Sequence, residues 1–212
     1  MSLRFNYCFL IIACLFTLGC KKNNQTPVTE NKTYQPTSKG SYWKYNQVSP
    51  TLSATETITM TGATSVFNSG LYFEYESVFE TGNSSAKATG YFYEKDGVVM
   101  SATLHGPESL FLKANAAVGE TWVYTKLISI DFAGGNVSES YNIIAEVVSK
   151  GITRTVAGKT FTDVIDLKFK QQPKSGAATA MYDCYVAKGV GLIERVSDDA
   201  KTTSSLIEYS IK

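Results

Sequence analysis

The chain is predicted to form an all-β fold of antiparallel strands, and three observations support this prediction. Its 212 residues include 13 tyrosines and 11 phenylalanines, and Thr, Ser and Gly are also abundant, a mixture that favours sheet over helix. Several segments alternate apolar and polar residues with period two, as a half-buried antiparallel strand requires. Short apolar runs are separated by residues typical of tight turns. We therefore expect antiparallel sheet arranged as a curved half-barrel or a sandwich.

The alternation is clearest in two segments. Between residues 161 and 170, Ile165, Leu167 and Phe169 face one way, and the residues between them are charged. Between residues 71 and 80, aromatic residues at alternate positions oppose three glutamates. Each of these segments is expected to bury one face and expose the other.

The strands of the first half are expected from Gly40 onward. Thr81-Gly82-Asn83 and Asp96-Gly97 are hairpin signals that separate three of them. In order, the expected strands are Tyr42–Val48, Thr55–Thr61, Leu71–Glu80, Ala86–Glu94, Val98–Thr103 and Ser109–Lys113. Only Leu110–Val118 has a pattern compatible with a helix, and this segment is short.

The second half continues the same pattern, with Gly134-Gly135-Asn136 as a further hairpin signal. In order, its expected strands are Thr121–Ile130, Glu139–Lys150, Arg154–Val156, Phe161–Lys170, Thr179–Ala187, Gly191–Val196 and Thr203–Ile211. Residues 40–212 are therefore predicted to form one β-rich domain.

Three short motifs occur twice along this domain, and their order is the same both times. The paired segments are Gly40–Tyr45 with Gly119–Tyr124, Gly70–Phe73 with Gly158–Phe161, and Tyr93–Val98 with Tyr185–Val190. The first pair reads Gly-x-x-Trp-x-Tyr and contains both tryptophans of the chain. The distance along the sequence between the two members of a pair grows from the first pair to the third, as loop insertions in a second copy would require. We expect an internal repeat relating residues 40–113 to residues 119–211; independent use of similar turn residues is the alternative.

The N-terminal segment has the layout of an export signal. Arg4 precedes the mainly apolar residues 7–19, which as a helix would be roughly 20 Å long, too short for a hydrocarbon core of about 30 Å. Cys20 follows directly. This arrangement resembles a bacterial lipoprotein signal, although Thr17 stands where Leu is usual. An ordinary secretory signal with an incidental cysteine is the alternative.

The resemblance implies that residues 1–19 are removed and that the Cys20 thiol carries diacylglycerol. Each buried methylene contributes about 0.8 kcal/mol, so two or more acyl chains hold firmly. Residues 20–39 are then the lipidated cysteine and a polar segment without apolar periodicity, which predicts a flexible tether with a reach of roughly 25 Å. In lipoproteins of this kind, Asp after the lipidated cysteine favours retention at the inner membrane, and an acidic run favours the cell surface. Lys21 and Lys22 match neither signal, so we expect the outer membrane, facing the periplasm.

Charge and cysteine content exclude some functions. Without residues 1–19, the remaining 193 residues carry 19 basic and 19 acidic side chains. A neutral chain lacks the field that nucleic-acid binding requires, so no nucleic-acid partner is expected. Cys184 is then the one free thiol, and it is expected to be a small buried residue in a strand.

No catalytic motif emerges, and no cofactor or metal site is expected. His105 is the only histidine and stands in a turn, which excludes a zinc site built from histidines. No nucleotide-binding glycine loop is present. Carboxylate pairs such as Glu74 with Glu76, or Asp163 with Asp166, are compatible with a hydrolase. Every solvated strand face offers such pairs, so this is the weakest functional hypothesis.

The aromatic surplus is the remaining signal. In Tyr91-Phe92-Tyr93, consecutive side chains point to opposite faces, so the three rings cannot share one core. Packing on both sides of a sheet is one interpretation, and an aromatic-lined groove is the other. The candidate ligand-binding residues are Trp43, Tyr45, Tyr75, Tyr91, Tyr93, Trp122 and Tyr124.

Three segments together carry a resemblance to a family: Gly-x-x-Trp-x-Tyr near the start, Thr155–Val164 in the middle and Tyr185–Ile193 near the end. Over about residues 40–211, the chain is similar to uncharacterised Bacteroidota lipoproteins, and the last segment is the most specific. The resemblance implies an antiparallel β-rich domain and no assigned activity. More distantly, the chain resembles the curved half-barrels of the lipoprotein-carrier (Lol) type, whose concave face takes acyl chains.

We therefore expect a lipid-anchored envelope lipoprotein that binds an apolar, sugar or peptide ligand through an aromatic sheet face and has no catalytic activity. A structural or accessory subunit of an envelope protein complex is the alternative. A carboxylate-based hydrolase comes third.

Overall fold

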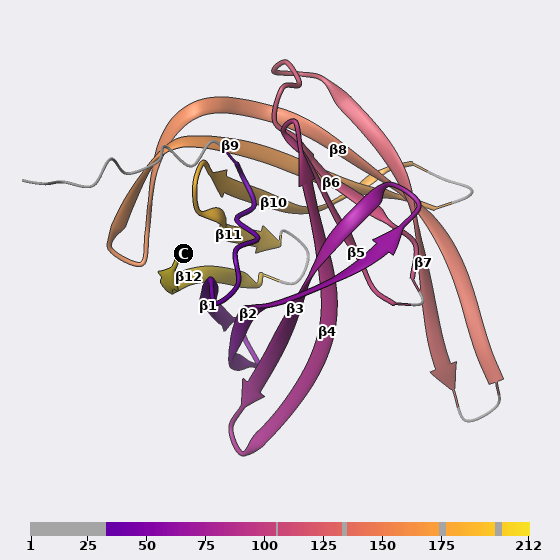
Figure 1. Cartoon of the computed structure of the whole chain (residues 1–212). Coiled ribbons are helices and arrows are strands. Elements are labelled where there is room, and N and C mark those ends of the chain that lie inside the picture. The colour runs from indigo at the N-terminus through magenta and orange to yellow at the C-terminus, as the bar shows by residue number, and fades with distance from the viewer. Residues whose placement is uncertain (1–32, 105, 133–134, 174–176, 198–200) are drawn as a thin grey trace, which may run out of the picture.

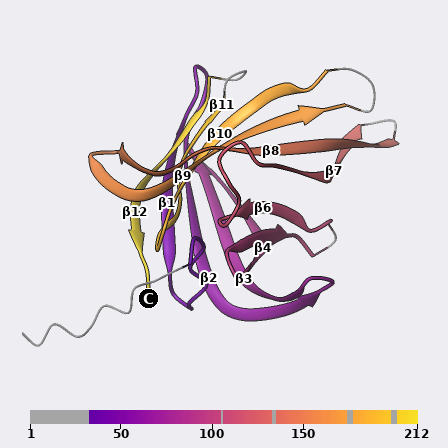
Figure 2. The ribbon, with the colours of Figure 1, turned by 90° about the horizontal axis from the view of Figure 1, so that it is seen from above.

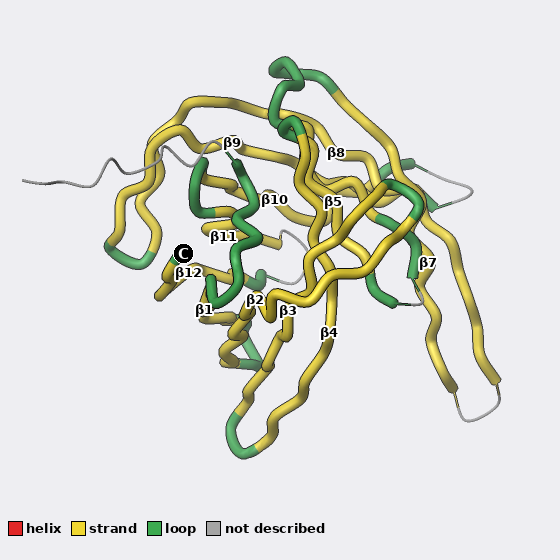
Figure 3. The backbone as a smooth tube through the Cα atoms, viewed as in Figure 1, coloured by secondary structure: helices red, strands yellow, loops and turns green. Residues whose placement is uncertain are grey.

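The computed structural model describes residues 33–104, 106–132, 135–173, 177–197 and 201–212, with backbone alone at 127–132 and 135–140. The described residues form strands and loops without a helix (Figure 3). The strands are β1 (Tyr42–Val48), β2 (Ser53–Phe67), β3 (Gly70–Thr81), β4 (Ser84–Lys95), β5 (Val98–Ala102), β6 (Ser109–Lys113), β7 (Thr121–Phe132), β8 (Gly135–Val156), β9 (Lys159–Gln172), β10 (Thr179–Ala187), β11 (Gly191–Ser197) and β12 (Thr203–Ser210). The predicted all-β fold is confirmed.

All twelve strands belong to one antiparallel sheet, in the order β6-β5-β4-β3-β2-β1-β12-β11-β10-β9-β8-β7. The sheet curls until its two edges, β6 and β7, approach each other, so that it is barrel-shaped and nearly closed (Figures 1 and 2). The indole of Trp122 on β7 donates a hydrogen bond of 3.0 Å to the Leu110 carbonyl on β6 across this seam. The half-barrel expectation therefore holds, and the sandwich alternative does not, because one sheet closes on itself instead of facing a second.

Every ladder except one joins strands that are neighbours in the sequence. The exception is β1 with β12, where Tyr42 pairs with Ser210 and Val48 pairs with Thr203. This pairing joins the two ends of the domain and closes the sheet on the side opposite the seam.

The expected alternation is confirmed on β9. Ile165, Leu167 and Phe169 are fully buried, and they pack with residues of β8 and β10 into the larger of two inner clusters. The second inner cluster surrounds Trp43 and Leu206 on β1 and β12. These clusters hold the curled sheet together from within.

Two expected strands are continuous in the structure. Residues 139–150 and 154–156 belong to the single strand β8, and the sequence between them forms bulges against β9. Gly151 takes a positive φ of 67° there, which bends the strand without ending it. The segment Leu110–Val118, which resembles a helix in its pattern, is β6 followed by a turn.

The last part of the expected tether is packed against the domain. Tyr34 and Gln35 are buried, and the Thr33 carbonyl accepts a hydrogen bond of 2.8 Å from the Gly189 amide. The Tyr34 hydroxyl also donates to Asp163 at 3.4 Å. Residues 33–39 are therefore not part of a flexible tether. The reason is the buried ring of Tyr34, which supplies an apolar contact that the polar composition around it does not suggest. We call residues 33–39 the strap.

The two halves of the chain fold as consecutive six-stranded meanders, β1–β6 and β7–β12. The three repeated motifs fall at matching places: at the start of the first strand, at the start of the third strand, and in the hairpin joining the fourth and fifth. In addition, the Trp43 indole donates to Val190 in the second half and the Trp122 indole donates to Leu110 in the first. This is the placement that an internal repeat of 40–113 and 119–211 predicts; the duplication itself stays a prediction.

No helix within the described part of the chain is both long enough and apolar enough to cross a bilayer.

Candidate functional site

A cavity of about 230 Å³ opens on the concave side of the sheet. Its lining is mainly aromatic and aliphatic, with a few polar side chains at intervals. The lining residues are Gln35, Trp43, Tyr45, Glu56, Ile58, Tyr75, Phe92, Ser101, Phe111, Leu192, Arg195 and Ser204. They come from both halves of the domain, and Gln35 comes from the strap.

Trp43 and Tyr45 form the inner wall of this cavity. They alternate with outward-facing residues of β1, so both rings point inward and both are buried. The Trp43 indole donates to the Val190 carbonyl at 2.6 Å, and the Tyr45 hydroxyl donates to the Leu192 carbonyl at 2.8 Å. Burial, and next the nearby Glu56, raise the pKa of Tyr45 far above its ordinary value. Since their polar atoms are satisfied, the two side chains present ring carbons to the cavity.

Tyr75 and Phe92 form a second part of the cavity lining, on β3 and β4. They stack with ring centroids 4.3 Å apart, at an interplanar angle of 24°. A Cβ atom at Gly90 would collide with the Tyr75 hydroxyl, so the glycine makes room for this ring. Burial, followed by Glu56, raises the pKa of Tyr75, which therefore remains neutral.

Glu56 is the acidic group of the cavity, and its oxygens already accept hydrogen bonds. Ser77 donates to Oε1 at 2.7 Å, and Gln47 donates to Oε2 at 3.0 Å. The carboxylate stands opposite Tyr45 in the β1–β2 ladder, which explains its effect on the phenol. These two hydrogen bonds hold the Glu56 carboxylate in place.

Arg195 is the basic group of the cavity. It pairs with the buried Cys184 in the β10–β11 ladder, so its side chain projects from the concave face. The guanidinium lies 5.7 Å from the centre of the Tyr182 ring, and the residue is exposed. No ion pair of Arg195 with a carboxylate is found among the described residues.

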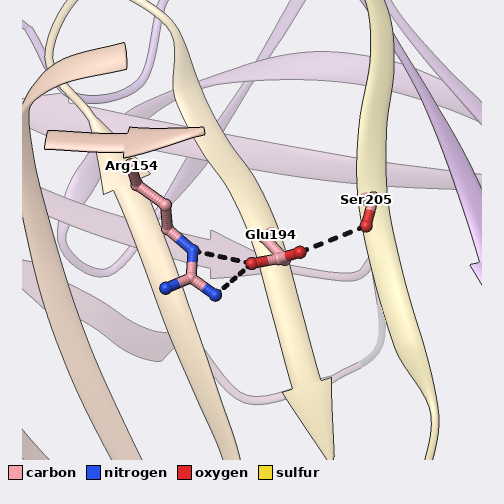
Figure 4. Close-up of polar contacts among 3 residues, drawn as sticks. All are labelled: Arg154, Glu194 and Ser205. Atoms are coloured by element: carbon pink, nitrogen blue, oxygen red, sulfur yellow. Dashed lines mark hydrogen bonds and ion pairs between the residues drawn. The ribbon is translucent and has the colours of Figure 1, made fainter. Parts of the chain in front are cut away.

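Glu194 precedes Arg195, lies on the other side of β11 and forms a closed polar group with Ser205 of β12 and Arg154 of β8 (Figure 4). Arg154 Nε donates to Glu194 Oε2 at 2.6 Å, its Nη2 contacts the same oxygen, and Ser205 donates to Oε1 at 3.3 Å. The guanidinium stacks 3.2 Å from the centre of the Tyr185 ring. Every charge in this group has a partner, so it stabilises the sheet and offers no open site.

The structure brings together three of the seven candidate aromatic residues, Trp43, Tyr45 and Tyr75, in the cavity. Tyr91 and Tyr93 lie on the other face of β4, in a small cluster with Tyr72 and Phe67. Their alternation with Phe92 is the physical reason, because only the middle ring of the three points inward.

Trp122 and Tyr124 are separated from the cavity as well. They pack in or against the other inner cluster, near the seam, where Trp122 is held by Leu110 and Tyr124 lies beside Tyr182. Burial raises the pKa of Tyr124 to about 12. The single aromatic surface expected from the sequence is thus divided among three places.

Several cavity residues could not be chosen from composition, notably Phe92, Phe111, Glu56 and Arg195. Phe92 could have been found from its phase, since it lies opposite the inward-facing Phe73 in the β3–β4 ladder. The inward position of Arg195 could not be predicted from alternation in the sequence. A bulge in the β10–β11 ladder, where the register shifts after Tyr185, determines which side chains of β11 face inward.

The carboxylate pairs proposed for a hydrolase are engaged elsewhere. Glu74 accepts hydrogen bonds from Thr61 at 2.9 Å and Tyr91 at 3.4 Å, and Glu76 pairs with Lys87 at 3.1 Å. Asp163 is bound by Tyr34 and lies 3.5 Å from Lys188. None of these carboxylates lines the aromatic cavity.

Asp166 differs from them, since its Oδ1 is buried and has no hydrogen-bond partner within the described part of the chain. Burial, and then the neighbouring Asp183, raise the pKa of this carboxyl group. Cys184 is buried as expected, and desolvation raises its pKa to about 12, so the thiol stays protonated. The residues that the structure describes contain no cluster of potential metal ligands. Cys20 and His105 lie outside the described residues.

No family model matches the chain, and no curated protein matches it. The structure is similar to that of a candidate lipoprotein from Parabacteroides distasonis, with a TM-score of 0.52 and 12% identity, covering 84% of this chain and 98% of that one. A candidate exported protein with a YmcC-like fold from Bacteroides fragilis matches with a TM-score of 0.45 and 10% identity, covering 82% of this chain and 97% of that one. The first likeness shows that this curled sheet occurs in another protein.

Proposed function

We propose that the protein is a lipid-anchored envelope lipoprotein that binds a small apolar ligand in its concave cavity without transforming it. The observation that carries the proposal is the wall formed by Trp43 and Tyr45. Each side chain donates its one hydrogen to a backbone carbonyl, and both rings line an open space of about 230 Å³. Apolar walls with a few fixed polar groups are typical of ligand sites.

The anchor rests on the sequence. Cys20 at the end of an apolar signal segment supports acylation, and the similar Parabacteroides protein is itself described as a candidate lipoprotein. We place the protein at the outer membrane, facing the periplasm, on the basis of Lys21 and Lys22 after the cysteine.

The proposal is tested with the soluble form that lacks residues 1–20 and the neutral fluorescent probe N-phenyl-1-naphthylamine. We expect saturable binding with one site. Ser101 lines the cavity, so Ser101→Phe should fill it and weaken binding at least about tenfold, whereas Ser85→Phe on an exposed part of β4 should not. Equal binding by both variants, or no saturable binding by the unmodified protein, would refute the proposal. Native mass spectrometry of the same protein would reveal any co-purified ligand.

A role as an accessory subunit of an envelope complex is the second candidate, and the end of the β2–β3 hairpin favours it. Val66 and Leu71 are cross-strand neighbours there and are 80% and 49% exposed. Cross-linking in cells should then trap a partner through residues of this hairpin, and Val66→Ser should reduce the yield. Absence of any adduct there would remove this candidate.

A further inference from the structure

We infer that the ligand of the concave cavity is a small amphiphile with one anionic group, and that Arg195 binds that group. The inference rests on the proposed function, because it names the chemistry of what the cavity holds. Its basis is a charge that the fold presents to an apolar cavity without compensating it.

Arg195 is the unusual member of the two arginines in the described chain. Arg154 has a carboxylate, and its guanidinium covers a tyrosine ring. Arg195 lines the cavity, its guanidinium lies 5.7 Å from the centre of the Tyr182 ring, and no carboxylate forms an ion pair with it among the described residues. A planar guanidinium has donors in a fixed fork that suits a carboxylate or phosphate. At the rim of an apolar cavity, this fork is free to receive an anion.

The positive potential of Arg195 reaches the cavity interior. Its charge opposes the rise in the pKa of Tyr45 and of Tyr182, and it acts in the same direction on the Cys184 thiol. Of these three groups, Tyr45 lines the cavity, Tyr182 lies 5.7 Å from the guanidinium, and Cys184 is paired with Arg195 in the β10–β11 ladder. An anion bound by the guanidinium would lie next to the apolar lining of the cavity, while the exposed Arg195 side chain stays accessible from solvent.

Glu56 sets the orientation of such a ligand. It stands on β2, three strands from Arg195 on β11, which corresponds to about 14 Å along the sheet. Its carboxylate is already satisfied by Ser77 and Gln47, and it repels a second anion. The charged end of the ligand is thus expected at Arg195 and its apolar body against Tyr75 and Phe92.

Octanoate, octyl phosphate and 1-octanol provide the test, since they share one alkyl chain and differ in the head group. Binding to the soluble form is measured by isothermal titration calorimetry. We expect octanoate or octyl phosphate to bind about 10- to 100-fold more tightly than 1-octanol, the range of a charged hydrogen bond. Tighter binding of octanoate would indicate a ligand with a carboxylate, and tighter binding of octyl phosphate would indicate a ligand with a phosphate. This preference should weaken at high salt, whereas 1-octanol binding should not.

Arg195→Gln should abolish the preference for the anionic probes over 1-octanol, and Arg195→Lys should restore part of it. Lys87→Gln makes the same change in net charge on an exposed hairpin and should leave the preference intact. Equal affinity of the unmodified protein for all three probes would overturn the inference while the proposed function stands. Failure of all three probes and of N-phenyl-1-naphthylamine to bind would overturn both.

Discussion

Glu194 and Arg195 are consecutive residues of β11 that point to opposite faces of the sheet, and their surroundings differ. On the outer face, Glu194 accepts hydrogen bonds from Arg154 and Ser205, the Arg154 guanidinium stacks on the Tyr185 ring, and every charge is compensated. On the inner face, Arg195 adjoins an aromatic cavity and forms no ion pair with a carboxylate among the described residues. The Arg154–Glu194 pair stabilises the sheet by joining its strands. Within the described part of the chain, the charge of Arg195 makes no comparable contact that would stabilise the fold. This difference separates residues that stabilise from residues that are available to bind.

The aromatic residues divide in the same way. Tyr72, Tyr91 and Phe67 close against one another on the outer face, with ring centroids 4.8 and 5.2 Å from Phe67. Tyr75 and Phe92 stack on the inner face but leave one side of the pair open to the cavity. Identical residue types thus make a packed cluster on one face and a wall on the other.

The largest effect is expected from Trp43→Ala, which removes a buried ring of the inner face and the donor to the Val190 carbonyl. We expect a loss of about 3–5 kcal/mol in the free energy of unfolding, measured with urea, because a cavity forms next to one that exists already. Trp43→Phe should lose less, since most of the apolar contact remains. A loss below about 1 kcal/mol for Trp43→Ala would mean that the wall is not part of the core, and the comparison of the two faces would need revision.

A smaller effect is expected from Glu194→Ala, which leaves the half-buried Arg154 without its carboxylate. We expect a loss of about 2 kcal/mol in unfolding free energy, as for a hydrogen bond to a charged group. Arg195→Gln is the matched change on the inner face and should stay within about 0.5 kcal/mol of the unmodified protein. If the two variants cost the same, the distinction between the two faces fails.

The smallest effect is expected from Asp166→Asn, and it should depend on pH. Burial raises the pKa of this carboxyl group above its ordinary value of 3.8, so the folded protein disfavours the ionised form. The resulting penalty is present at neutral pH and disappears as pH falls through the raised pKa toward the ordinary one. We therefore expect Asp166→Asn to raise the unfolding free energy at neutral pH, by less than about 1 kcal/mol because the site is partly solvated.

The measurement for Asp166→Asn is thermal unfolding between pH 3 and pH 8. The gain in Tm over the unmodified protein should shrink with decreasing pH. A gain that is the same at every pH, or a loss at neutral pH, would show that the ionised carboxylate is satisfied in solution.

The sequence predicts the fold further than it predicts the site. The alternation of Ile165, Leu167 and Phe169 and the turn at Asp96-Gly97 are local properties, and the structure confirms both. The sequence does not predict the full length of β8, because bulges continue its ladder with β9 through a segment that contains Gly151. Local sequence cannot tell a bend within a strand from the end of one.

The cavity depends on properties that no single strand carries. Its lining comes from strands of both halves, so it exists only once β1 pairs with β12 across the ends of the domain. A bulge at Ile193, which lies unpaired between Leu192 and Glu194 in the β10–β11 ladder, also sets which residues of β11 face inward, and this places Arg195 there. An aromatic-rich composition indicated that some rings would face a ligand or a second layer, but it could not say which.

The meeting of β1 and β12 has a consequence for how the chain could be reconnected. The Lys212 amide donates a hydrogen bond of 3.1 Å to Ser41 Oγ, so the two ends of the β-domain are in contact, while the seam of the sheet lies in mid-sequence between β6 and β7. A circular permutant that joins Lys212 to Gly40 and begins at Thr121 would list its strands in their spatial order. The one long-range ladder would become a hairpin, and contact order, which slows the folding of β proteins, would fall to that of a simple meander.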